Sequence, residues 1–202
     1  MKKIAVLASG QGTNLEAILE AAERGEIAGQ ISLVISDRAE APALGRAERR
    51  GIRAVYFNPR EYAGREKYDL ALINELREAQ VDLVVLAGYM RLLTAQFVAA
   101  FSLKIMNIHP SLLPAFPGLD GVEQALEYGV KVTGCTVHFV DEGLDSGPVI
   151  LQEAVPVLQH ETINTLHQRI HAAEHRLYPR AIDLFCRDKL KVEGRRCLII
   201  DE

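Results

Sequence analysis

Residues 3–22 read KIAVLASGQGTNLEAILEAA, and this stretch indicates how the chain folds. Its first part, Lys3–Ala8, is a short and almost continuous apolar run, which favours a strand covered on both faces. Ser9, Gly10, Gln11 and Gly12 end the run. Apolar residues then recur at helical spacing, at Leu15, Ile18, Leu19 and Ala22, until Gly25. We therefore predict a strand, a glycine turn and a helix in succession, as at the start of a βαβ unit.

The same alternation continues through the first half of the chain. We expect further strands at Ile31–Ser36, Ala54–Phe57, Asp82–Ala87 and Lys104–Ile108. Helices are expected at Ala43–Arg50, along the residues Leu70, Ile73, Leu76 and Ala79, and at Phe97–Phe101. Strands that alternate with helices predict a parallel sheet with helices on both faces.

The pattern changes in the second half. Two strand-like runs, Val132–Val140 and Val149–Val157, are joined by a turn-rich segment, as in an antiparallel hairpin. A long helix follows from Ile163 to Leu184, and Pro179 is expected to bend it or to end its first segment. The last residues form two short strand-like pieces around Gly194. We predict an α/β fold: a Rossmann-like, mostly parallel sheet with helices on both faces and an antiparallel extension in the C-terminal half.

Composition excludes several classes of protein. The chain has 202 residues, 49% apolar and 25% charged, and a net charge of −4, so it lacks the basic surface typical of nucleic-acid binders. Its three cysteines form no C-x-x-C pair, which disfavours a disulfide framework. The apolar run near the N-terminus is too short for a signal peptide or a membrane span. We expect a cytoplasmic protein with small-molecule partners, no nucleic acid and no membrane.

The glycine turn between the first strand and helix is a candidate anion site. Free backbone N–H groups at a helix start can receive a phosphate, and Thr13 and Asn14 can add donors or act as the N-cap. A dinucleotide fingerprint would have a third glycine where this chain has Leu15, with Asp37 holding a ribose. A monophosphate site needs only the turn and the helix start. The residues alone leave both interpretations open, together with a plain tight turn.

Asn107 and His109 follow the fifth predicted strand, and residues two apart on a strand point to the same face. The carboxyl edge of such a sheet is where ligands bind. A carboxamide can donate to an oxyanion, a histidine can move protons near neutral pH, and Asp145 can orient that histidine. These are the groups that formyl transfer to an amine requires. Structural roles for each of the three residues remain open on the residues alone.

Three segments carry a family resemblance: NIHPSLLPAFPG (107–118), TGCTVHFVDEGLDSGPVI (133–150) and VLAGYMRLL (85–93). Together they resemble the folate-dependent glycinamide ribonucleotide formyltransferases of purine synthesis. The first two are shared with other formyl-folate enzymes, and GQGTN near the N-terminus points to the glycinamide ribonucleotide branch. The resemblance implies a single formyltransferase domain over 1–202, with a phosphate-binding half (1–103) and a catalytic and folate-binding half (104–202).

The resemblance also implies roles for particular residues. Asn107, His109 and Asp145 match the catalytic trio, and Gly12, Thr13, Asn14 and Glu174 match the substrate-binding residues. The co-substrate 10-formyltetrahydrofolate would contact Arg65, Met90, Arg91, Leu92, Leu93, Asp141, Glu142, Gly143 and Leu144. It further implies no metal, a monomer or homodimer, a cis peptide before Pro114, and a place for His138 near the active site. The chain departs from many members at 118–123 (GLDGVE), where they carry a histidine.

Other interpretations compete with this one. A formyltetrahydrofolate hydrolase would use the same trio with water as acceptor, and a transfer-RNA formyltransferase would need an added basic domain. A nicotinamide-dependent oxidoreductase and a non-catalytic nucleotide-binding module are the alternatives of other classes. His167, His171 and His175 recur every four residues, a spacing that can bind zinc, but we interpret them as a solvated helix face. We also interpret the basic pairs Arg49-Arg50 and Arg195-Arg196, and His160, as solvated.

Overall fold

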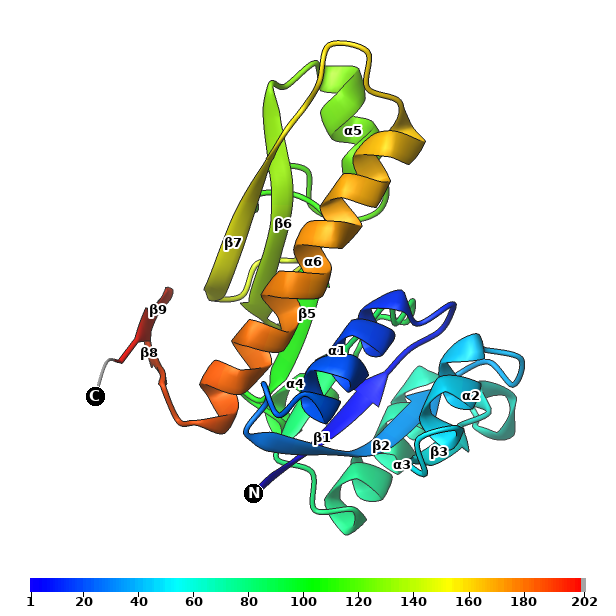
Figure 1. Ribbon diagram of the computed structural model, residues 1–202. Coiled ribbons are helices and arrows are strands. Elements are labelled where there is room, and N and C mark those ends of the chain that lie inside the picture. Colours follow the sequence, from blue (N-terminus) through cyan, green and yellow to red (C-terminus); the bar gives the residue numbers. More distant parts are fainter. Residues whose placement is uncertain (201–202) are drawn as a thin grey trace.

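The structure is a computed structural model, and it describes residues 1–200 (Figure 1). Its nine-stranded sheet has the order β3-β2-β1-β4-β5-β6-β7-β9-β8. The strands are β1 (Lys2–Leu7), β2 (Gly29–Ser36), β3 (Arg53–Tyr56), β4 (Leu83–Leu86), β5 (Ile105–His109), β6 (Val132–Phe139), β7 (Val149–Pro156), β8 (Leu190–Glu193) and β9 (Arg196–Ile199). The helices are α1 (Thr13–Glu23), α2 (Pro42–Glu48), α3 (Arg65–Glu78), α4 (Ala95–Ala100), α5 (Gly121–Tyr128) and α6 (Ile163–Cys186), with a 3₁₀ turn at Pro59–Glu61.

The pairing of the strands confirms the predicted fold class. Strands β3, β2, β1, β4 and β5 are parallel, whereas β6 runs antiparallel to both β5 and β7. Strand β9 joins β7 through the single pair Val149–Arg196, and β8 pairs with β9. The antiparallel part therefore extends a parallel sheet in the C-terminal half, as expected.

Two apolar cores cover the two faces of the sheet. Side chains alternate along β1, so Ile4 and Val6 pack into one core and Ala5 and Leu7 into the other. The first core contains the inner faces of α1 and α6, which lie side by side, and the second contains those of α3 and α4 (Figure 1). Burial on both faces explains why β1 and β4 read as continuous apolar runs.

Two features differ from the sequence expectations. Helix α5 was not predicted; it starts after Asp120, whose φ is 59°, and ends at Gly129, whose φ is 81°. Its first residue is Gly121, and glycine is a poor helix former, so the sequence gives no clear signal for the start of this helix. Helix α6 continues through Pro179 to Cys186, so Pro179 does not end it.

The parallel strands place three of the candidate site segments at one edge of the sheet. The glycine turn follows β1, residues 89–93 follow β4, and His109 is the last residue of β5. Because β1, β4 and β5 are neighbours and run in the same direction, their carboxyl ends meet. This is the edge at which open α/β sheets bind ligands.

Candidate active site

Asn107 and His109 project from the same face of β5. Met106 and Ile108, the residues that alternate with them, are buried in the core under α1 and α6. Asn107 is half-buried and His109 is 4% exposed. Because side chains alternate along a strand, Asn107 and His109 point to the opposite face of β5, as expected.

The imidazole of His109 lies between two acceptors. Its Nε2 is 2.7 Å from the carbonyl oxygen of Phe116, and its Nδ1 is 3.4 Å from Oδ2 of Asp145. A ring that carries hydrogens on both nitrogens satisfies both partners at once. The two contacts therefore hold the imidazole in a fixed orientation at the end of β5.

Asp145 reaches His109 from the loop between β6 and β7. Its φ of 48° is in the left-handed region, which Asp tolerates better than most residues. Its Oδ2 also accepts a 2.8 Å hydrogen bond from the backbone N–H of Gly118. Asp141 stabilises the loop, because its Oδ1 accepts from the Ser146 hydroxyl at 2.7 Å and from the Gly143 N–H at 3.1 Å. The structure thus brings Asn107, His109 and Asp145 together from separate parts of the chain.

His138 is a fourth member of this cluster. It lies opposite Asn107 in the β5–β6 pairing, and Nδ2 of Asn107 is 3.3 Å from its Nε2. Its Nδ1–H donates to the carbonyl oxygen of Phe139 at 2.9 Å, so Nε2 is left to accept from Asn107. Burial lowers the pKa of His138, which favours this neutral form. His138 therefore orients the Asn107 carboxamide.

The glycine turn leads into α1 without a side-chain cap. Gly12 is the N-cap, with φ of 70°, and no side chain accepts from the first turn. Thr13 and Asn14 are accordingly not caps, which excludes one of the alternatives. The Oδ1 atom of Asn14 is buried with no hydrogen-bond partner among the described residues. The helix start therefore keeps free backbone donors, which an anion needs, and the Asn14 Oδ1 acceptor, which a hydroxyl or amine can donate to.

Glu174 faces this turn from α6. Nδ2 of Asn14 donates a 3.0 Å hydrogen bond to its Oε2, and Nε2 of His171 lies 3.8 Å from the same atom. Glu174 is only 3% exposed, and burial raises its pKa to about 7 even though the bond from Asn14 lowers it. An ionisable carboxyl is thus buried beside the glycine turn.

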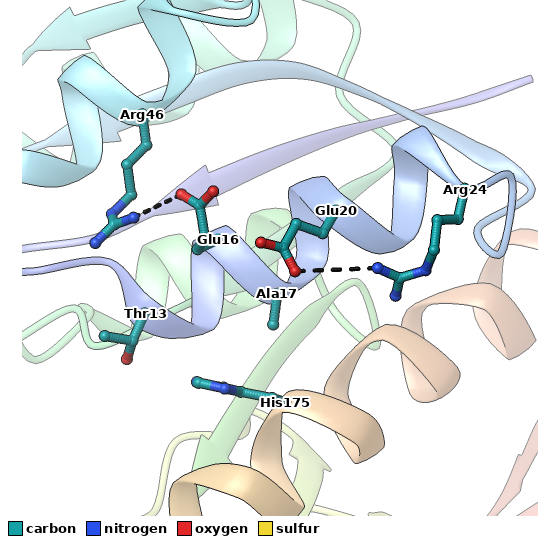
Figure 2. Close-up of a pocket in the computed structure, with 7 residues that line it drawn as sticks. All are labelled: Thr13, Glu16, Ala17, Glu20, Arg24, Arg46 and His175. Carbon is teal, nitrogen blue, oxygen red and sulfur yellow. Dashed lines mark hydrogen bonds and ion pairs between the residues drawn. The ribbon is translucent and has the colours of Figure 1, made fainter.

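His171 and His175 are not on a solvated helix face, which corrects that expectation. Both are half-buried where α6 packs against α1, whereas His167 and His160 are exposed. Burial, followed by the neighbouring His167 and His175, lowers the pKa of His171 to about 4. A cavity of about 320 Å³ lies at this contact. Its lining residues, drawn in Figure 2, are Thr13, Glu16, Ala17, Glu20, Arg24, Arg46 and His175.

Three of the residues expected to contact folate are large apolar side chains that lie exposed on the surface. Met90 is 64%, Leu92 66% and Leu144 60% exposed, a high value for large apolar side chains. The segment after β4 is anchored by a 2.9 Å hydrogen bond from the N–H of Met90 to the Ser9 hydroxyl. The other expected folate residues are placed as follows: Arg65 is exposed at the first position of α3, Arg91 and Leu93 are half-buried, Asp141 is half-buried, and Glu142 and Gly143 are exposed.

Comparison with known proteins identifies the family. The sequence pattern of the formyl transferase family matches residues 2–182. The chain belongs to the formyl transferase family. The peptide bond before Pro114 is cis, as the resemblance implied.

Individual relatives of this formyl transferase are similar over nearly its whole length. Phosphoribosylglycinamide formyltransferase of Bacillus subtilis is 47% identical over 90% of this chain and 93% of its own. Glycinamide ribonucleotide transformylase 1 from Symbiobacterium toebii is 55% identical, with a TM-score of 0.97 over 100% of this chain and 95% of that one. The human trifunctional purine biosynthetic protein adenosine-3 is 44% identical over 99% of this chain, which spans 20% of that protein.

A formyltetrahydrofolate deformylase from Pseudomonas syringae also has this fold. It is 28% identical, with a TM-score of 0.91 over 99% of this chain and 66% of its own. The sequence identity of this formyl transferase to the three proteins named above, 44–55%, is therefore higher than its identity to the deformylase.

Within residues 1–200, no three His, Cys, Asp or Glu side chains gather closely enough to hold a metal ion. No helix of this formyl transferase in that range combines the length and apolarity needed to cross a bilayer. Asp37, considered as a ribose ligand, has a buried Oδ1 without a hydrogen-bond partner in the described part of the chain.

Proposed function

We propose that this formyl transferase moves the formyl group of 10-formyltetrahydrofolate onto the amine of glycinamide ribonucleotide, a step of de novo purine synthesis. The observation that carries the proposal is the convergence of Asn107, His109 and Asp145, with Nδ1 of His109 3.4 Å from Oδ2 of Asp145. High identity to phosphoribosylglycinamide formyltransferase of Bacillus subtilis supports the choice of acceptor.

The phosphate-bearing substrate binds at the start of α1. The N–H groups of Gly12, Thr13 and Asn14 receive the phosphate, since the helix start offers unpaired donors and positive dipole charge. Glu174 accepts hydrogen bonds from substrate hydroxyl or amine groups beside Asn14, where it is already positioned. This half of the site corresponds to residues 1–103, with Glu174 contributed by α6.

The formyl-folate co-substrate binds between the segment after β4 and the β6–β7 loop. Met90, Leu92 and Leu144 provide exposed apolar area for a flat ring system. Arg65, Arg91, Leu93 and residues 141–143 complete this half of the site. The formyl carbon then lies within reach of the Asn107 and His109 side chains.

The chain's own residues stabilise charge and move one proton. When the substrate amine attacks the formyl carbon, a C–N bond forms and the carbonyl oxygen becomes an oxyanion. Asn107 donates to that oxyanion through its free Nδ2 hydrogen, with protonated His109 beside it. The bond from the formyl carbon to the folate nitrogen breaks, and the proton released by the amine reaches that nitrogen through His109 or through a water held by Asp145.

A spectrophotometric transfer assay with 10-formyltetrahydrofolate and candidate amines tests the proposal. We expect glycinamide ribonucleotide to be formylated and His109→Ala to lose most of the activity, by roughly 100-fold or more. Near-wild-type turnover by His109→Ala would reject the catalytic assignment. Rejection of the transferase itself would come from wild-type enzyme that leaves glycinamide ribonucleotide unchanged.

The same assay separates two rival functions. A hydrolase releases formate without an amine, so product analysis with and without glycinamide ribonucleotide distinguishes it. A non-catalytic nucleotide-binding module binds glycinamide ribonucleotide but gives no turnover of folate. The hydrolase is the rival that this assay tests because a deformylase shares this fold at 28% identity, whereas the formyltransferase of Bacillus subtilis is 47% identical.

A further inference from the structure

The glycine turn is packed directly against α2, an element outside the site described so far. A Cβ atom added to Gly12 would lie 3.0 Å from Cβ and 3.1 Å from Cα of Ala43. The backbone of the turn therefore has no free space on its α2 side. Movement of α2 would change where the turn's N–H groups point.

Arg46 on α2 ties the turn to α1. Its Nε donates a 2.9 Å hydrogen bond to the carbonyl oxygen of Gln11, the residue before Gly12. Its Nη1 donates a 2.6 Å bond to Oε2 of Glu16, on the first turn of α1, as Figure 2 shows. One rigid guanidinium thus holds both ends of the segment that starts the helix.

Glu16 is shared with a second arginine. Nη2 of Arg50 donates to its Oε1 at 2.6 Å, and Nε of Arg50 donates to Glu23 at 2.8 Å. The side chains of Glu16, Arg46 and Arg50 are only 19–25% exposed, so these pairs are less screened than surface ion pairs. Of the basic pair Arg49-Arg50, Arg49 is exposed as expected, whereas Arg50 is half-buried and paired with Glu16 and Glu23, which corrects that expectation.

Burial alone would raise the pKa of Glu16. The hydrogen bonds from Arg50 and Arg46 outweigh burial, and the pKa lies below its ordinary value. The lowered pKa favours the ionised form of Glu16, which is the form that pairs with Arg46.

We infer that Arg46 is a positioning residue for the phosphate-bearing substrate, because it holds Gln11–Asn14 in the conformation that presents its backbone N–H groups to the phosphate. The inference rests on the proposed function. Arg46 acts through the turn: its Nε is engaged by Gln11 and its Nη1 by Glu16. It also keeps α1 in the register from which Asn14 reaches Glu174.

Two methionine variants separate positioning from charge. Arg46→Met removes the bond to Gln11, whereas Arg50→Met removes an equal charge and a bond to Glu16 but leaves Gln11 bonded to Arg46. We expect Arg46→Met to raise KM for glycinamide ribonucleotide about tenfold, the equivalent of one charge-assisted hydrogen bond. The kcat and the KM for 10-formyltetrahydrofolate should stay near wild type. Arg50→Met should raise KM less than about threefold, and Arg46→Lys should be intermediate, since lysine keeps the charge without the fork.

A binding measurement keeps this test independent of turnover. The dissociation constant of inorganic phosphate, titrated against wild type, Arg46→Met and Arg50→Met, should rise about tenfold for Arg46→Met alone. Equal constants for wild type and Arg46→Met, or wild type that binds no phosphate, would overturn the inference. Wild type that binds phosphate but transfers no formyl group would instead contradict the proposed function. If Arg46→Met does not fold, an unchanged phosphate constant for Arg46→Lys overturns the inference, and a raised one supports it.

Discussion

Nδ2 of Asn14, on the first turn of α1, lies 3.0 Å from Oε2 of Glu174 on α6, so two residues 160 positions apart in the chain share a hydrogen bond. This hydrogen bond joins the segment that follows the glycine turn to α6. Because Glu174 is buried, its pKa is raised to about 7, and both of its protonation states are populated near neutral pH.

Glu174 should make the free energy of unfolding decrease as pH rises. The folded pKa of about 7 lies above the ordinary 4.5, so the native state binds the proton more tightly than the unfolded chain does. This stabilisation is present below the unfolded pKa and is lost as pH rises through the folded one. Glu174→Gln abolishes the dependence, so its stability relative to wild type should increase by up to about 3 kcal/mol across that range.

Urea unfolding at several pH values between about 4 and 8 measures this difference. Glu123→Gln, an exposed substitution on α5, is the control for general effects of removing an acid. A gap between Glu174→Gln and wild type that stays constant with pH would contradict the assignment of the buried carboxyl.

The parts of this structure that follow from local sequence were predictable. Strand β1, the turn and α1 were read from an apolar run, Gly12 and helical spacing. The shared direction of Asn107 and His109 followed from their separation by two residues on a strand. These features depend on backbone periodicity alone, which a sequence carries directly.

Features that depend on packing between distant elements were not predictable. His138 contacts Asn107 because of the β5–β6 register, which no local pattern specifies. His171 and His175 share the spacing of a solvated face with His167, yet they are half-buried because α1 packs across that part of α6. Arg50 reads as a surface residue until Glu16 and Glu23 are placed beside it.

Asp145→Asn should lower kcat by roughly 100-fold or more, if the carboxylate takes part in proton movement as proposed. The asparagine still accepts from the Gly118 N–H, so the loop should keep its conformation. It no longer offers a negative charge to Nδ1 of His109. Single-turnover rates of formyl transfer measure the effect, and circular dichroism monitors the fold. A folded variant with a wild-type rate would show that the carboxylate is dispensable.

Gly121→Ala should displace the His109 imidazole, because Gly121 at the start of α5 lies against it. The added Cβ would lie 3.2 Å from Nε2 of His109 and 3.2 Å from the Phe116 carbonyl oxygen, so the hydrogen bond between them must shift. We expect kcat to fall about tenfold, whereas stability changes by only about 1 kcal/mol because alanine favours the helix.

Gly45→Ala, in α2, is the matched control, since its Cβ would meet only the flexible end of Arg49 at 3.4 Å. Imidazole nitrogen NMR signals report the His109 environment directly. Unchanged His109 signals together with an unchanged rate in Gly121→Ala would mean that the α5 start yields to the new methyl group instead.

Arg195, in the turn between β8 and β9, supports the loop that carries Asp145 from outside. Its Nη2 donates a 2.7 Å hydrogen bond to the carbonyl oxygen of Ser146. Arg195 lies beyond residues 2–182, the part that matches the formyl transferase pattern.

Arg195→Ala should raise KM for 10-formyltetrahydrofolate about threefold, a small effect because an exposed hydrogen bond contributes about 1 kcal/mol or less. The KM for the amine substrate should not change, because Arg195 contacts the β6–β7 loop and not the glycine turn before α1. Arg196→Ala removes the same charge from the adjacent exposed position and should leave both constants near wild type. If the two alanine variants raise the folate KM equally, the effect comes from net charge and the contact with Ser146 does not hold the loop.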